Sequence, residues 1–192
     1  MPNQYTFPYF PDYMKWAYFT DPPWLCCEDG ETPCLVGTYF DGSEDLPDEI
    51  CLHDLVTGKY RVDVPDYLEQ ALARSIQATF SDLAADEVQL RCSAAVAALS
   101  KTPPVPWIQS NAWPVCHGDF CQYTGEWNQE ELTKHAPDGN GLAYLMTILV
   151  NLDTSPIANP AGLWDEIASG WTTIFVFQCF TCGKRLAQEQ SF

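Results

Sequence analysis

Basic residues are scarce in this 192-residue chain, in which nine Lys and Arg stand against 26 Asp and Glu. The resulting formal charge of −17 repels the phosphate backbone of nucleic acids, so we expect no nucleic-acid partner. The shortage of basic residues is most marked in one segment, because residues 28–54 hold nine acids and no Lys or Arg. A basic protein is the natural complement of such a chain, although a solvated surface that only maintains solubility has the same composition.

Long apolar runs are absent as well. The longest apolar stretch, Leu142 to Val150, is too short to cross a bilayer. The first residues lack the basic start and following apolar run of a secretory signal. We therefore expect an intact cytoplasmic protein with no membrane contact.

Apolar residues make up 46% of the chain and aromatics 14%, enough for a packed core. Residues 66–100 carry apolar side chains at helical spacing, and residues 172–178 are β-branched and aromatic, as in a strand. We expect an α+β fold: a single domain over 1–192 with a helical segment, a small antiparallel sheet and zinc-ribbon-like cysteine knuckles. Residues 1–60 would form an N-terminal arm with a degenerate knuckle, and 61–192 a helical and β core ending in a CxxC hairpin.

Other local patterns refine this prediction. Residues 66–100 should form two helices, or one bent helix, which Thr102-Pro103-Pro104 terminates. Further helices are predicted over about 128–135 and 141–152, and a third from the cap Asn159-Pro160 to Ala168. Shorter strands are expected over 35–40 and 185–190, and the aromatic, proline-rich residues 1–27 should be extended.

Nine cysteines, an odd number in a reducing compartment, argue against a disulfide framework. The strongest local signal is Cys179-x-x-Cys182, which resembles a zinc-ribbon knuckle and precedes a glycine suited to a tight turn. A structural zinc site needs four ligands, and Cys116, His117 and Cys121 are the obvious further donors. Two outcomes stay open: one structural zinc, or no metal and thiols that are simply buried.

The N-terminal half repeats this pattern more weakly. Cys26 and Cys51 each begin a CxxC-like spacing in which Asp29 or Asp54 replaces the second cysteine. Cys27, Cys34 or His53 could substitute as ligands, but we expect a decayed site held by hydrogen bonds.

An enzyme must also be considered. His117-Gly118-Asp119 followed by Cys179-x-x-Cys182 is superficially similar to the zinc deaminase signature. The signature has Glu at the position of Asp119 and Pro at the position of Gln178. The two motifs are also more than sixty residues apart in this chain, which is long for that signature. Because nucleotide-binding, GxSxG and HExxH motifs are absent too, we expect no catalytic activity.

The order of these motifs resembles the CbrC family of bacterial proteins. An aromatic-proline opening at Tyr9-Phe10-Pro11-Asp12 precedes the knuckles at Cys26 and Cys51. The specific part of the resemblance lies in residues 102–125 and 175–184, which contain Cys116-His117-Gly118-Asp119-Phe120-Cys121 and Phe177-Gln178-Cys179-Phe180-Thr181-Cys182-Gly183-Lys184. The resemblance implies a role in tolerance of an antibacterial toxin of the nuclease colicin kind.

These observations together predict an immunity or tolerance protein, a monomer that binds a cognate basic toxin one-to-one through a contiguous acidic face. Trp24 is a further candidate anchor, because buried aromatic side chains carry much of the binding energy at interfaces. The alternative is a zinc-dependent enzyme or a zinc-stabilised stress protein. The proposed toxin contacts are Asp29, Glu31, Tyr39, Phe40, Asp41, Glu44, Asp45, Asp48 and Glu49.

Overall fold

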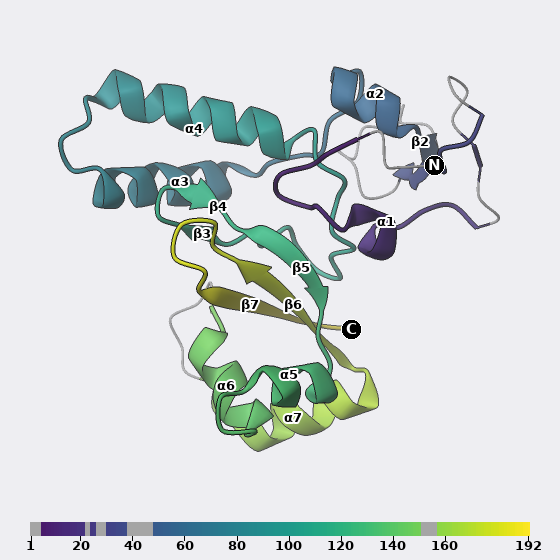
Figure 1. The fold of residues 1–192 in the computed structure, drawn as a ribbon, viewed down its shortest axis with the longest axis vertical. Coiled ribbons are helices and arrows are strands. Elements are labelled where there is room, and N and C mark those ends of the chain that lie inside the picture. Colours follow the sequence, from purple (N-terminus) through teal and green to yellow (C-terminus); the bar gives the residue numbers. More distant parts are fainter. Residues whose placement is uncertain (1–4, 22–23, 26–29, 38–47, 151–156) are drawn as a thin grey trace.

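The computed structural model describes residues 5–21, 24–25, 30–37, 48–150 and 157–192, which form an α+β fold in a single domain (Figure 1). The helices of these residues are α1 (Tyr13–Trp16), α2 (Leu52–Thr57), α3 (Asp66–Thr79), α4 (Ala85–Leu99), α5 (Gln129–His135), α6 (Gly141–Ile148) and α7 (Pro160–Ser169). Their strands are β1 (Leu35–Val36), β2 (Glu49–Ile50), β3 (Val115–Cys116), β4 (Asp119–Phe120), β5 (Gln122–Glu126), β6 (Thr172–Gln178) and β7 (Arg185–Ser191). All pairings between these strands are antiparallel.

A three-stranded sheet, in the order β5-β6-β7, lies at the centre of the molecule. Side chains alternate across β6, so Phe175 and Phe177 point into one hydrophobic cluster while Ile174 and Val176 point into another. Helices α5, α6 and α7 cover the second face, and the α3–α4 hairpin extends from the other side (Figure 1). This double burial explains why residues 174–177 of β6 are all apolar.

The two helices predicted within residues 66–100 are confirmed as α3 and α4. Leu68, Leu72 and Ile76 recur every four residues on α3 and are fully buried. The chain reverses direction between Phe80 and Ala84, and α4 ends before the prolines, as expected.

Helices α5, α6 and α7 begin at asparagine caps. The side chains of Asn128, Asn140 and Asn159 each accept a 3.0 Å hydrogen bond from a backbone N–H in the first turn. The expected helix over 141–152 is shorter in the structure, since α6 ends at Ile148 and the Val150 amide donates to the carbonyl of Ala187 on β7.

The N-terminal arm packs on the same core as the later residues. Phe10 meets Tyr123 of β5 edge to face at 4.9 Å. The expectation of a wholly extended arm was wrong in one place, because the short helix α1 brings Trp16 against Gly125. Gly125 has a φ of +125° beside an irregular step in the β5–β6 register, and a Cβ there would lie 2.6 Å from the indole.

His135 provides a pH-dependent contribution to stability. Its ring stacks on the ring of Trp127 at a centroid distance of 4.3 Å. Burial and the charge of Arg185 lower the pKa of His135 below the ordinary 6.5; Lys134 also lowers this pKa, and Glu131 raises it. The folded state therefore binds this proton more weakly than the unfolded state, and stability falls as the pH drops below 6.5. We expect His135→Gln to flatten the decline between about pH 7 and 5 in urea unfolding, and an unchanged slope would contradict this.

Candidate metal centre

The β3–β4 hairpin positions Cys116 and His117. Cys116 pairs with Asp119, so His117 and Gly118 form a two-residue turn, and their φ angles of +53° and +77° are those of a type I′ turn. The turn is held against α3, because the Gly118 amide donates to Ser75 Oγ at 3.0 Å. A Cβ on residue 118 would lie 3.3 Å from the backbone of Ile76, so glycine also permits this close packing.

The β6–β7 connection positions Cys179 and Cys182. The Cys179 amide donates to the Lys184 carbonyl, and the Gly183 amide donates back to the Cys179 carbonyl at 3.0 Å. The backbone amides of Thr181 and Cys182 donate hydrogen bonds to the Cys179 sulfur. This closed turn has the form of a metal-binding knuckle, in which amides stabilise a thiolate before any ion arrives.

The two turns bring four ligand atoms together, all within 4.8 Å of one another. Cys116 Sγ lies 4.0 Å from Cys182 Sγ and 3.1 Å from His117 Nδ1, and Cys179 Sγ lies 3.6 Å from the same nitrogen. A tetrahedral zinc ion with Zn–S bonds of about 2.3 Å separates its sulfur ligands by about 3.8 Å. The donor spacing therefore fits such an ion. Across the part of the chain that the structure describes, this is the one such group.

The pKa values of the Cys116 and Cys179 thiols are shifted in opposite directions. Burial, together with the neighbouring thiols of Cys179 and Cys182, raises the pKa of Cys116 to about 12. Burial also raises the pKa of Cys179, but hydrogen bonds from the backbone of Cys182 and Thr181 and from the thiols of Cys116 and Cys182 together outweigh it and bring the value to about 7. A cation at the centre of the group would favour the thiolate form of each ligand.

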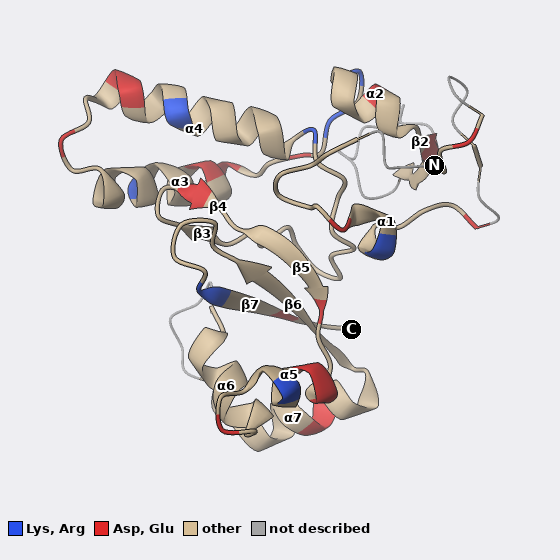
Figure 2. Cartoon of the chain, viewed as in Figure 1, with Lys and Arg blue, Asp and Glu red and all other residues tan. Residues whose placement is uncertain are grey.

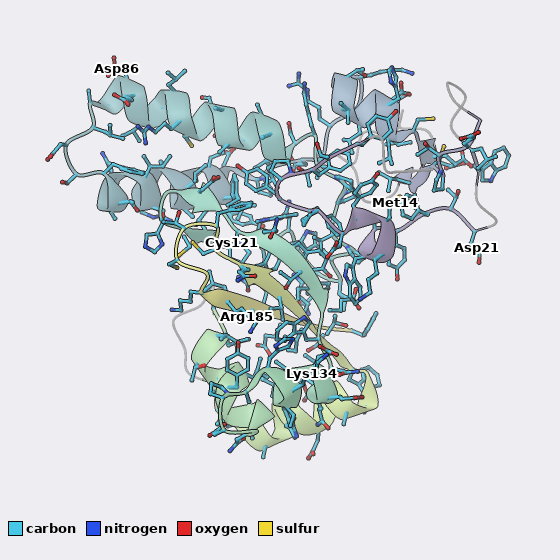
Figure 3. The ribbon with its side chains drawn as sticks, in the orientation of Figure 1. Met14, Asp21, Asp86, Cys121, Lys134 and Arg185 are labelled. Carbon is cyan, nitrogen blue, oxygen red and sulfur yellow. The ribbon has the colours of Figure 1, made fainter. Side chains whose placement is uncertain are left out.

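Cys121, expected as a further ligand, is not part of this group. It follows β4 (Figure 3) and is fully buried. Its carbonyl accepts a 2.7 Å hydrogen bond from Trp113 Nε1. Burial, followed by the nearby cysteines, raises its pKa. Cys121 is packed in the hydrophobic core and is not one of the four grouped ligands.

Asp119, which stands where the deaminase signature has Glu, is held in place by two hydrogen bonds. Its Oδ1 accepts hydrogen bonds from the Tyr9 hydroxyl at 2.6 Å and from the Phe120 amide at 2.8 Å. It lines a groove of about 550 Å³ together with Tyr9, His117 and Arg91 of α4. Sequence reasoning missed the link to Tyr9, because the two residues are 110 positions apart and no local pattern connects them.

The weaker N-terminal motif does not assemble a comparable group from its described residues. Asp54 forms a 2.8 Å ion pair with Lys59. Cys34 and Cys51 lie side by side, with their sulfurs 3.5 Å apart. Cys26, Cys27 and Asp29 lie outside the described residues.

The proposed toxin contacts are only partly within the described residues. Glu31 and Asp48 are exposed, and Glu49 is half-buried on β2. Asp29, Tyr39, Phe40, Asp41, Glu44 and Asp45 lie outside the described residues. Acidic side chains of the described residues also lie on α3, α4 and α5 (Figure 2), and the contiguous acidic face expected within residues 29–49 stays a prediction.

The fold and the four-residue group define an α+β protein with a candidate metal centre of three cysteines and one histidine. A model of the uncharacterised protein family UPF0167 matches residues 5–190, and the chain therefore belongs to this family. No curated protein and no solved structure matches the chain. In the described residues, no helix combines the length and the apolar character that crossing a bilayer requires.

Proposed function

We propose that this protein is a zinc-stabilised binding protein in which Cys116, His117, Cys179 and Cys182 hold one structural zinc ion. The observation that carries the proposal is the convergence of these four donors from two separate turns. Thiolate and imidazole ligands suit zinc, whereas magnesium and calcium prefer oxygen. Four protein ligands fill a tetrahedral shell, and a catalytic zinc keeps one position open for water or substrate. The ligand set therefore favours a structural role over an enzymatic one.

The ion would join elements that are far apart in the sequence. Cys116 and His117 belong to the β3–β4 hairpin, while Cys179 and Cys182 belong to the β6–β7 connection. When bound, zinc supplies positive charge that stabilises three neighbouring thiolates. The chain's own contribution is to hold the ligands in register through the packing of Gly118 on α3 and the hydrogen bonds of the knuckle.

Metal analysis of the purified protein tests this proposal. We expect about one equivalent of zinc per chain, because a closed four-ligand site retains its ion through purification. Removing the metal with a chelator should lower the melting temperature by about 6–12 °C, the shift that a loss of roughly 3 kcal/mol produces in a chain of this size.

The Cys92→Ser variant provides a matched control. Cys92 is a buried thiol on α4 that lies outside the ligand group, so this variant should keep its zinc and its response to chelator. Substoichiometric zinc, together with a melting temperature that chelator does not change, would contradict the proposal.

We also propose that the chain is of the CbrC type and that it neutralises a basic antibacterial toxin in the cytoplasm by forming a one-to-one complex. Charge supports this proposal: residues 16–58 contain ten acids and no Lys or Arg. Trp24 lies within this stretch and is 61% exposed, which is unusual for so large an apolar side chain. Acidic groups steer a basic partner into place, and an exposed tryptophan supplies apolar area to bury on contact.

A binding assay with the toxin encoded beside this protein's gene tests the second proposal. We expect Trp24→Ala to weaken the complex by at least about tenfold, and added salt to slow association. Trp171→Ala is the matched control, because Trp171 is equally exposed, at 61%, but lies in the connection between α7 and β6. Absence of a complex with the zinc-loaded protein at low salt would contradict toxin binding and favour a zinc-stabilised stress protein.

A further inference from the structure

Cys34 and Cys51 face each other across the short β1–β2 ladder. Leu35 pairs with Ile50 and Val36 with Glu49, so one further step in the same register places Cys34 opposite Cys51. Their sulfur atoms lie 3.5 Å apart, and both residues are present as thiols. Neither residue belongs to the candidate metal centre.

The backbone hydrogen bonds show which kind of pair this is. The Cys34 amide donates to the Trp24 carbonyl at 2.7 Å, and its carbonyl accepts from the Thr20 amide at 3.0 Å. Both main-chain groups of Cys34 therefore point away from β2, which makes Cys34 and Cys51 a non-hydrogen-bonded antiparallel pair. In such a pair the Cα atoms are about 4.5 Å apart, close to the lower end of the roughly 4.4–6.8 Å that a disulfide spans.

We propose that Cys34 and Cys51 form a redox-active dithiol that is closed by low-molecular-weight disulfides of the glutathione class. Cys51 is half-buried and Cys34 only 4% exposed, so the Cys51 thiolate is the group that attacks the small disulfide. A sulfur–sulfur bond forms between Cys51 and one half of the oxidant, and the other half leaves as a thiol. Cys34 then displaces the remaining half.

The two steps balance. Two protein thiols are oxidised to one disulfide, one small disulfide is reduced to two small thiols, and the two protons lost by the protein appear on those products. The ring so closed runs from residue 34 to residue 51. It contains most of the residues proposed above as toxin contacts: Tyr39, Phe40, Asp41, Glu44, Asp45, Asp48 and Glu49. Oxidation would thus tie together the two ends of the acidic segment.

Disulfide mapping of the zinc-loaded wild-type protein tests the proposal. The protein is incubated with oxidised glutathione, quenched in acid, alkylated and digested. We expect a Cys34–Cys51 peptide pair whose mass is lower than that of the two reduced peptides by two hydrogen atoms, and its full reversal by a reductant. If both cysteines stay alkylatable, or if Cys34 is joined to Cys26 or Cys27 instead, the proposal is wrong.

Single variants separate the two steps. Cys34→Ser should stop at a mixed disulfide of glutathione with Cys51. In Cys51→Ser, the reaction of Cys34 should be at least about tenfold slower, because its thiol is buried. Cys92→Ser should form the same bond at the wild-type rate, and equal reactivity of Cys34 and Cys51 in the single variants would overturn the assigned order.

Discussion

Replacing Cys179 by serine is expected to abolish stoichiometric zinc binding and to lower the free energy of unfolding by about 3–5 kcal/mol. Cys179 is the buried ligand of the group, and backbone amides already stabilise its thiolate. A serine hydroxyl offers zinc a poor replacement at that position, and three remaining donors no longer close the shell. Zinc content and urea unfolding of the same preparation measure the two effects together.

Cys121→Ser serves as the control that distinguishes ligation from proximity. Cys121 lies close to the group but outside it, so its variant should lose stability through the buried hydroxyl and still retain about one zinc. Full zinc content in Cys179→Ser, or loss of zinc in Cys121→Ser, would mean that the ligands have been assigned wrongly.

Phe177→Ala is expected to lower the free energy of unfolding by about 3–5 kcal/mol. Phe177 is fully buried near the C-terminal end of β6 and contacts three aromatic rings: Trp107 at 5.8 Å, Trp113 at 5.4 Å and Tyr123 at 5.2 Å. Truncation removes this packing and leaves a cavity that a three-stranded sheet cannot collapse to fill. Chemical denaturation followed by tryptophan fluorescence measures the loss.

Phe192→Ala gives the contrast for this experiment, because the same substitution is made at a side chain that is 76% exposed. Its effect should stay within about 0.5 kcal/mol. If Phe177→Ala and Phe192→Ala lower the free energy of unfolding by similar amounts, the sheet between the two hydrophobic clusters is not the main source of stability.

Local patterns in the sequence predicted the longer helices and strands, but not the short helices α1 and α2. The four-residue spacing of Leu68, Leu72 and Ile76 marks one helix face, and the β-branched and aromatic residues of 172–178 mark a strand, whose apolar residues 174–177 are buried on both sides. The end of α6 could not be predicted in the same way. Residues 149–150 are as apolar as the helix before them, and only their pairing with Ala187 on β7 takes them out of it.

The metal centre was predictable as a set of candidates but not as a geometry. The spacing of Cys179 and Cys182 indicates a knuckle directly, because both ligands come from one turn. The sequence shows no difference between Cys116 and Cys121 as partners, and the hairpin register decides between them. A turn at His117 and Gly118 places Cys116 beside the knuckle, whereas Cys121 follows the second strand into the core.

X-ray absorption at the zinc edge of the purified protein tests the central claim most directly. The account predicts a first shell of three sulfur atoms at about 2.3 Å and one nitrogen at about 2.0 Å, from Cys116, Cys179, Cys182 and His117. A shell of four sulfurs would bring Cys121 into the site and remove His117. A shell of oxygen and nitrogen alone, or a protein without zinc, would contradict the claim that these two turns form a metal centre.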